Sequence, residues 1–269
     1  MQLHEYLIPL KNGTWRQGII LQNGDCFGDV APLPGFSQET FEEAKAETHH
    51  VIKTGAIPKL PSVQFAVACA DIALPNRLEV SVAALNREGE GFNAVKLKLG
   101  ELCLEDAIAL VKQTGAKEIR LDFNQKWPLE KLLRFADHFS PEHFAYLEEP
   151  TKEFADLFAF AKLTGMPIAV DESIPTTPYW EIPTLKAVVA KPTILGKIPY
   201  VPPNTELIFS SAYESGVGLL HIARLAREHN PHRAHGLDSY SQLLQDVIDP
   251  RPVIEKGILL WNGPLRLLI

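Results

Sequence analysis

Cysteine is scarce in this chain of 269 residues. Its three cysteines, Cys26, Cys69 and Cys103, are odd in number and far apart, and none of them forms a CxxC motif. Each stands in apolar sequence, so we expect three reduced, buried thiols. This usage argues against a disulfide framework and is typical of a cytoplasmic protein.

Long apolar runs and dense basic blocks are also missing. No apolar stretch approaches the roughly 20 residues that a membrane-spanning helix needs. The first residues, 1–6, contain no basic segment followed by an apolar core, so no secretory signal is visible. The net charge is -7, and no Lys/Arg cluster is dense enough for a nucleic-acid site. We therefore expect a cytoplasmic protein with neither nucleic-acid nor membrane partners; monomer and homo-oligomer both stay open.

A glycine-rich phosphate loop after an early strand is the third absence, and it argues against an open doubly wound sheet. From about residue 78, short apolar runs alternate with helical patterns, which is typical of a (β/α)8-type barrel. The helix after residue 191 is expected to be nearly absent, because four prolines follow. Strands are predicted near 79–83, 94–98, 118–122, 144–147, 167–170, 187–190, 206–209 and 233–237. Helices are predicted near 102–114, 128–139, 153–164 and 214–229.

The first third of the chain has a different order. Residues 18–21 and 26–31 flank an Asn-Gly turn and predict a hairpin. A helix is predicted to start at Ser37, and a second one to cover 62–73. We therefore predict an N-terminal α+β domain over 1–77 and a barrel over 78–249. The last segment, 250–269, is a candidate completion of the N-terminal layer.

Five apolar runs in the barrel region end in a residue that chemistry can use. Since the carboxyl ends of parallel barrel strands meet on one face, these side chains are expected to converge. They are Lys96 with Lys98, Asp122, Glu148, Asp171 and Lys191.

The three acids predict a metal site. Asp122, Glu148 and Asp171 are each about one strand-helix unit apart, so they come from three successive strands. Carboxylate oxygens are the ligands that Mg²⁺ prefers, and the lack of histidine at these strand ends argues against zinc. A helix cap or a surface ion pair remains the alternative for any one acid taken alone.

The lysines are candidates for acid/base work. Lys96 and Lys98 alternate along one strand and point to one face, which must be the interior because Val95 and Leu97 occupy the other. Neighbouring positive charge and partial burial are expected to lower a lysine pKa toward the working pH. Lys191 lies across the ring of strands. Together with a metal that stabilises an enediolate, these groups suit removal of a proton α to a carboxylate.

These residues resemble the active-site pattern of the enolase superfamily, in its muconate-lactonising subgroup. That pattern has Lys-x-Lys on the second barrel strand, Asp, Glu and Asp on the next three, and Lys on the sixth. Four further stretches resemble the o-succinylbenzoate synthase family. They are 28–40, 61–66, 191–193 and 210–218, and the likeness runs from about Arg16 to Asp238.

The resemblance implies a (β/α)7β TIM-type barrel with a reduced N-terminal α+β capping domain. It implies a lyase (a hydro-lyase) that uses Mg²⁺, with Mn²⁺ as a substitute. The substrate is a small carboxylate, 2-succinyl-6-hydroxy-2,4-cyclohexadiene-1-carboxylate, which loses water to give o-succinylbenzoate in menaquinone biosynthesis. Little sequence separates Ile8 from Gly18, where a substrate-covering loop is expected in the family.

The resemblance also implies residue roles. Lys98 is the base and returns its proton to the departing hydroxyl, Lys96 tunes Lys98, and Lys191 stabilises the intermediate through a cation–π contact. Asp122, Glu148 and Asp171 hold the metal. The remaining candidates orient ligands or bind the succinyl carboxylate through hydroxyl and backbone donors: Asn124, Glu149, Glu172, Ser210 and Ser211.

Other functions stay open at this point. An N-acylamino-acid racemase or dipeptide epimerase of the same superfamily uses the same two lysines on opposite faces. A non-catalytic barrel would be expected to have lost a lysine or an acid, and none is lost here. A Schiff-base aldolase also places lysine in a barrel but needs no three acids in succession.

Overall fold

The computed structural model describes residues 1–86 and 91–269. The chain begins with an antiparallel sheet in the order β1-β2-β3, formed by β1 (Gln2–Pro9), β2 (Trp15–Asn23) and β3 (Cys26–Val30). Asn23 pairs with Cys26 across a tight turn in which Gly24 has φ +59°. The predicted hairpin is confirmed. Strand β1 was not predicted, because its alternation of apolar and polar residues is weak.

Two helices follow, α1 (Phe41–Thr54) and α2 (Pro61–Cys69). The prediction that α1 starts at Ser37 is wrong: its N-cap is Thr40, which forms a capping box with Glu43. The Ser37 hydroxyl instead accepts a hydrogen bond from the Leu33 N–H at 2.9 Å. Helix α2 ends four residues before its predicted end at residue 73.

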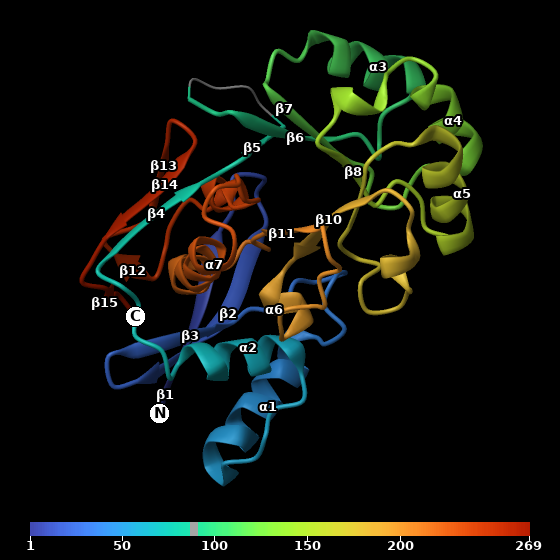
Figure 1. Cartoon of the computed structure of the whole chain (residues 1–269). Coiled ribbons are helices and arrows are strands. Elements are labelled where there is room, and N and C mark those ends of the chain that lie inside the picture. The colour runs from blue at the N-terminus through green and yellow to red at the C-terminus, as the bar shows by residue number, and fades with distance from the viewer. Residues whose placement is uncertain (87–90) are drawn as a thin grey trace.

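Seven parallel strands form the main sheet, in the order β11-β10-β9-β8-β7-β6-β5 (Figure 1). The helices α3 (Leu104–Gln113), α4 (Leu129–Ala136) and α5 (Phe154–Thr164) pack outside it, and α6 (Pro192–Leu195) and α7 (Gly216–His229) follow β10 and β11. The strands are β5 (Ala84–Leu85), β6 (Ala94–Lys98), β7 (Glu118–Asp122), β8 (Tyr146–Glu148), β9 (Ile168–Val170), β10 (Leu185–Ala190) and β11 (Glu206–Phe209).

The predicted strand at 233–237 is wrong in detail. Only isolated bridges form there, from His235 to Val82 and from Gly236 to Ser210. Pro231 and the turn around it leave this segment too short for a regular ladder. The bridges nevertheless close the ring between β11 and the segment that leads into β5.

The predicted strand at 79–83 is shifted. Strand β4 (Arg77–Ser81) pairs antiparallel with β14 (Ile258–Asn262), which in turn pairs with β13 (Val253–Glu255). A further pair joins β12 (Ile248–Asp249) and β15 (Arg266–Leu267). Among the described residues, the C-terminal strands therefore form two small sheets of their own, one of them with β4 just before the barrel, and none of them pairs with the β1-β2-β3 sheet. Short 3-10 turns complete the structure at 141–143, 179–181 and 238–242.

The hydrophobic core explains why these runs become barrel strands. On β6, Val95 and Leu97 are buried in a cluster with Leu104 of α3 and Phe135 of α4. The alternate residues of that strand are Lys96 and Lys98, which face the barrel interior and its mouth. This alternation around the sheet yields an α/β barrel with an N-terminal α+β domain, so the predicted fold class is confirmed.

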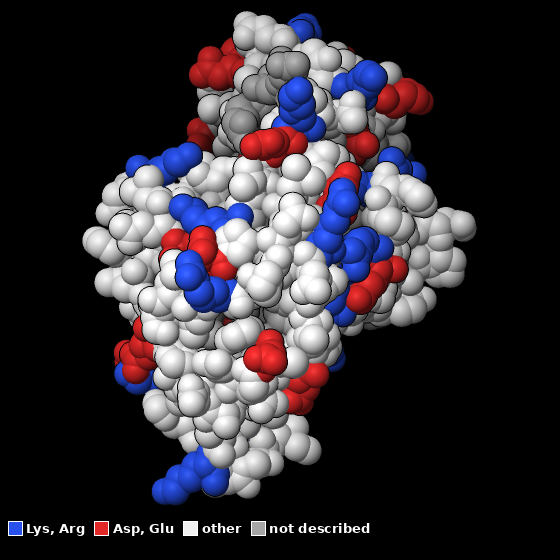
Figure 2. Space-filling model, turned by 90° about the vertical axis from the view of Figure 1, so that its left-hand side faces the viewer, with Lys and Arg blue, Asp and Glu red and all other residues white. Residues whose placement is uncertain are grey.

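The cysteine expectation is partly wrong. Cys69 is buried and Cys26 is half-buried, but Cys103 is exposed. Cys103 is the N-cap of α3, and its thiol accepts from the Asp106 N–H. Within residues 1–86 and 91–269, every helix is too short or too polar to cross a membrane. The face shown in Figure 2 carries acidic and basic side chains interspersed with one another.

Candidate active site

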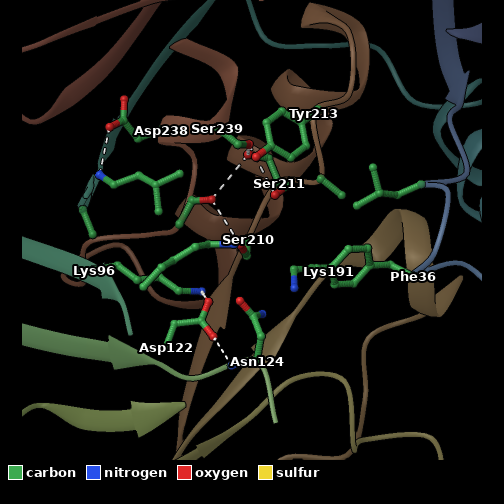
Figure 3. Close-up of a pocket in the computed structure, with 16 residues that line it drawn as sticks. Phe36, Lys96, Asp122, Asn124, Lys191, Ser210, Ser211, Tyr213, Asp238 and Ser239 are labelled. Atoms are coloured by element: carbon green, nitrogen blue, oxygen red, sulfur yellow. Dashed lines mark hydrogen bonds and ion pairs between the residues drawn. The ribbon is translucent and has the colours of Figure 1, made fainter. Parts of the chain in front are cut away.

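The carboxyl ends of the barrel strands surround a cavity of about 130 Å³ (Figure 3). The barrel supplies most of its wall, and the N-terminal domain supplies Leu33 and Phe36. Of the residues predicted from the sequence, seven line it: Lys96, Lys98, Asp122, Asn124, Lys191, Ser210 and Ser211. Glu148 and Asp171 lie behind them and are buried, with exposed fractions of 1% and 5%.

Lys96 lies between two of the predicted metal ligands. Its Nζ is 2.7 Å from Glu148 Oε1 and 3.0 Å from Asp122 Oδ2. Burial disfavours the ammonium, but the carboxylates of Asp122, Glu148 and Asp171 outweigh it and raise the pKa of Lys96. Burial likewise works against the Asp122 carboxylate, but Lys96 and Lys98 hold the pKa of Asp122 below its usual value.

Lys191 occupies the far wall. Its ammonium donates to Asp171 Oδ2 and lies 3.9 Å from Glu172 Oε1. Burial opposes the charged form, but Asp171 and Glu172 outweigh it and raise the pKa of Lys191. The expectation that the lysine pKa values fall is therefore wrong for Lys96 and Lys191, because paired carboxylates overcome burial. The centroid of the Phe36 ring lies 5.8 Å from Lys191 Nζ (Figure 3).

Lys98 differs from the other two lysines because its side chain is exposed and none of the hydrogen bonds or ion pairs within 1–86 and 91–269 involves its ammonium. Its backbone N–H donates to Asn86 Oδ1 at 2.8 Å, which fixes the end of β6. The side chain lines both the main cavity and an adjoining cavity of about 250 Å³. Lys96 and Lys191 line the main cavity as well, but their ammonium groups are paired with carboxylates.

Asp122 and Glu148 are paired in register on β7 and β8, and Glu148 pairs with Ala169 of β9, two residues before Asp171, which follows that strand. Glu148 Oε2 is buried without a hydrogen-bond partner in the part of the chain that the structure describes, so it has a lone pair to offer a cation. In this arrangement one oxygen of each acid faces a lysine ammonium group, namely Glu148 Oε1, Asp122 Oδ2 and Asp171 Oδ2. The described residues include no group of three or more His, Cys, Asp or Glu set to hold a metal ion. The donor chemistry fits a hard divalent cation.

Three predicted supporting residues make contacts that shape the strand ends. Asn124 Nδ2 donates to Glu172 Oε1 at 3.1 Å, and its backbone N–H donates to Asp122 Oδ1 at 3.0 Å. Glu149 is fully buried, and its Oε1 accepts from the Asp171 N–H at 2.6 Å. Glu149 therefore orients the backbone that carries Asp171.

Ser210 and Ser211 line the cavity, but their backbone donors are already used. The Ser210 N–H donates to Ala190 O at 2.9 Å, and the Ser211 N–H donates to Gly236 O at 3.0 Å. The predicted role of these backbone N–H groups toward a carboxylate is therefore wrong, because they complete the barrel. The hydroxyl groups remain at the cavity, with that of Ser211 2.5 Å from the Ser239 hydroxyl.

Several site residues had no predicted role. Leu33, Phe36 and Tyr213 lie in stretches that resemble the family, but no chemical pattern assigned them to the cavity. Gln125 Nε2 donates to Glu149 Oε2 at 2.7 Å, and the Ser173 hydroxyl donates to Glu149 Oε1 at 2.6 Å. Asn124 and Gln125 have positive φ, of 45° and 60°, and no sequence signal marks that turn.

Two family models match the chain. "Enolase C-terminal domain-like" matches residues 79–182, which contain the three acids and the first two lysines. "MenC, N-terminal domain" matches residues 1–74. The two matches cover the N-terminal layer and the barrel from β5 through β9.

Relatives and solved structures agree with these models. A Pasteurella multocida o-succinylbenzoate synthase is 31% identical, over 93% of this chain and 92% of its own. A solved o-succinylbenzoate synthase from Thermosynechococcus elongatus BP-1, with Mg in its active site, has a TM-score of 0.69 at 22% identity and covers 91% of this chain and 94% of that one. A dipeptide epimerase from Enterococcus faecalis has a TM-score of 0.76 at 16% identity, over 99% and 96% of the two chains. These two structural likenesses speak for the fold alone, and the identity to the Pasteurella relative speaks for the family. The chain therefore belongs to the o-succinylbenzoate synthase family, a family of lyases within the enolase superfamily.

Proposed function

We propose that this chain catalyses the dehydration of 2-succinyl-6-hydroxy-2,4-cyclohexadiene-1-carboxylate to o-succinylbenzoate, in menaquinone biosynthesis. The observation that carries the proposal is the placement of Lys98 at the end of β6 and of Lys191 directly after β10. Three strands separate β6 from β10, and both lysines line one cavity with Asp122. An acidic carbon held between these strands has a base on one side and a cation on the other.

Asp122, Glu148 and Asp171 would hold a divalent cation, Mg²⁺ or Mn²⁺. When bound, such an ion neutralises charge on a substrate carboxylate and so acidifies the adjacent C–H bond. The unpartnered Glu148 Oε2 and the three hard oxygen donors support this assignment.

Lys98 is the proposed base. In its neutral form, it takes the proton from the ring carbon that bears the carboxylate, and the C–H electron pair forms a ring double bond. The C–O bond at the neighbouring carbon breaks, and the hydroxyl leaves as water with the proton that Lys98 returns. The exposed position of Lys98 supports this exchange. Within 1–86 and 91–269, no carboxylate forms a hydrogen bond or an ion pair with its ammonium.

Lys191 and Lys96 have electrostatic roles in this proposal. Lys191 faces the cavity as a permanent cation and can lie over the ring of the substrate. Lys96 sits between Asp122 and Glu148 and offsets part of their mutual repulsion. Glu149 and Asn124 keep the backbone of the acid-bearing strand ends in place.

The direct test is to mix purified protein, Mg²⁺ and the cyclohexadiene substrate and to follow the absorbance of the diene. We expect the absorbance to fall as o-succinylbenzoate forms, with stoichiometric release of water. The Lys186→Ala variant is a suitable control, because Lys186 is exposed and pairs with Glu206 at 3.6 Å on the surface. Absence of turnover in the parent protein would refute the proposal.

An isotope experiment separates the proposal from a racemase. In D₂O, a racemase acting on an N-succinylamino acid exchanges the α-proton from both faces and leaves deuterium in the product of inverted configuration. We expect the dehydration to be far faster than any such incorporation. Rapid racemisation without dehydration would assign the chain to the sister activity.

A further inference from the structure

Two walls of the cavity come from loops that lie far apart in the sequence. Leu33 and Phe36 belong to the segment after β3, and Tyr213 belongs to the loop before α7. Phe36 is 47% exposed, and Tyr213 has φ +62°, so neither wall is held by a regular element. Figure 3 shows Phe36 beside Lys191, and Tyr213 near Ser211 and Ser239. The distance between these two walls must therefore be fixed by contacts outside the cavity.

Arg16 of β2 connects these two loops. The side chain is 3% exposed, and its guanidinium donates to three carbonyls. Nη1 donates to Pro32 O at 2.6 Å, Nη2 donates to Ala31 O, and Nε donates to Tyr213 O at 3.2 Å. The planar fork therefore ties the residues just before Leu33 to a residue of the opposite wall, a contact that lysine cannot reproduce.

Asp29 of β3 makes a second connection beside the first. It is 1% exposed, and its carboxylate accepts from the Tyr6 hydroxyl at 2.9 Å and from the Ser215 N–H and hydroxyl at 3.0 and 2.7 Å. Ser215 is the N-cap of α7, so this carboxylate holds the first turn of the helix that follows Tyr213.

The packing around Asp29 is tight. A Cβ atom added to Gly218, in the first turn of α7, would lie 2.9 Å from Asp29 Oδ2. The first turn of α7 is therefore pressed against the N-terminal sheet, and the loop that carries Tyr213 cannot move without disturbing these buried bonds.

We infer that Arg16 and Asp29 are positioning residues for the reaction, because together they fix the distance between the Leu33–Phe36 wall and the Tyr213 wall. The inference rests on the proposed function insofar as it assigns this cavity to the substrate. Neither residue lines the cavity, so each acts through the loops that it holds.

The test compares Arg16→Met and Arg16→Lys with the parent protein and with Arg266→Met. Arg266 is a matched control because its guanidinium pairs with Asp249 on an exposed surface. For each protein, KM and kcat for dehydration are measured together with amide hydrogen exchange in peptides covering 31–37 and 210–216. Thermal unfolding shows which variants fold.

For Arg16→Met we expect KM to rise at least tenfold, kcat to fall less than threefold, and exchange to accelerate in both peptides but not in β6. Arg16→Lys should fall between this variant and the parent, and it keeps the test usable if Arg16→Met does not fold. Unchanged exchange in both peptides would overturn the inference, and so would a loss confined to kcat. If the parent shows no dehydration, the proposed function fails, and the exchange data still decide the role of Arg16.

Discussion

At the scale of single residues, the charges of buried acids and buried ammonium groups compensate one another at the inner end of the pocket. Lys96 and Lys191 have their positive charge secured by carboxylates, which raises the pKa of each. Lys98 lies at the cavity mouth, and its charge also lowers the pKa of Asp122, but its ammonium forms no hydrogen bond or ion pair with the residues that the structure describes. In the mechanism that we propose, Lys98 therefore transfers the proton, and the other two lysines act as fixed cations.

This division of labour predicts the outcome of Lys98→Ala. The variant should fold normally, because the side chain is exposed, and should lose about 10³-fold in turnover, within the range for removal of a general base. Steady-state kinetics on the cyclohexadiene substrate measure the loss, with Lys186→Ala as the control. Activity within tenfold of the parent would remove Lys98 from the role of base.

Asp29 predicts a dependence of stability on pH. Burial raises the pKa of its carboxyl from 3.8 to about 6, so the folded state binds a proton more tightly than the unfolded state. The stability that this protonation contributes is present below about pH 4 and is lost as the pH rises through 6. The loss amounts to about 3 kcal/mol, at 1.36 kcal/mol for each unit of pKa.

The check is the free energy of unfolding of the parent and of Asp29→Asn, measured in denaturant between pH 4 and 7. Because asparagine does not titrate, the parent should lose stability relative to the variant as the pH rises from 4 to 6. A difference that stays flat across this range would show that Asp29 has an ordinary pKa.

At the scale of elements, the barrel strands were predictable and the N-terminal edge elements were less so. Strand β6 was predicted with its bounds, because Val95 and Leu97 alternate with lysines and turn residues flank the run. The α1 start was misplaced, because Ser37 and Thr40 are both good caps and only Thr40 has Glu43 three residues later in helical register. The strand predicted at 233–237 was wrong, because pairing in this segment depends on distant partners. These partners are the residue after β11 and the residue after β4.

The contact between β3 and α2 predicts an effect of Gly28→Ala. A Cβ atom there would lie 1.9 Å from Ala66 O, a backbone atom that cannot move without shifting α2. We expect a loss of about 3 kcal/mol in the free energy of unfolding from this overpacking. Gly115→Ala is the matched control, since its Cβ would meet nothing within 4 Å. Equal stability of the two variants would contradict the tight packing of β3 on α2.

At the scale of the whole molecule, the active site depends on two units of the chain that meet at the mouth of the barrel. The acids and lysines were predictable because strand ends in a parallel barrel converge whatever the details of packing. The contributions of Phe36 and Tyr213 were not, because they depend on how the N-terminal layer docks on the barrel. The hydrogen bond from the Ser211 N–H to Gly236 O, which helps to close the barrel, could not be predicted either, because it depends on a partner far along the chain.

Cation binding should stabilise the whole fold, because the three acids are assembled only in the folded chain. At a hundredfold excess of Mg²⁺ over its Kd, the gain is about 2.7 kcal/mol, which raises the unfolding midpoint by roughly 5 °C. Differential scanning calorimetry with Mg²⁺ or with EDTA measures this shift. In Glu148→Gln the shift should largely disappear, and an undiminished shift there would place the ion elsewhere. EDTA should also abolish turnover, and Mg²⁺ or Mn²⁺ should restore it.

The chemistry that we propose depends on one divalent cation bound by Asp122, Glu148 and Asp171 beside Lys98 and Lys191. The most direct measurement is a crystal structure of the protein with Mn²⁺ and o-succinylbenzoate, with data collected at the manganese absorption edge. We predict one anomalous peak in contact with an oxygen of each acid and of the product carboxylate. A peak elsewhere, or no peak with Lys96 and Lys191 still bound to the carboxylates, would contradict the account.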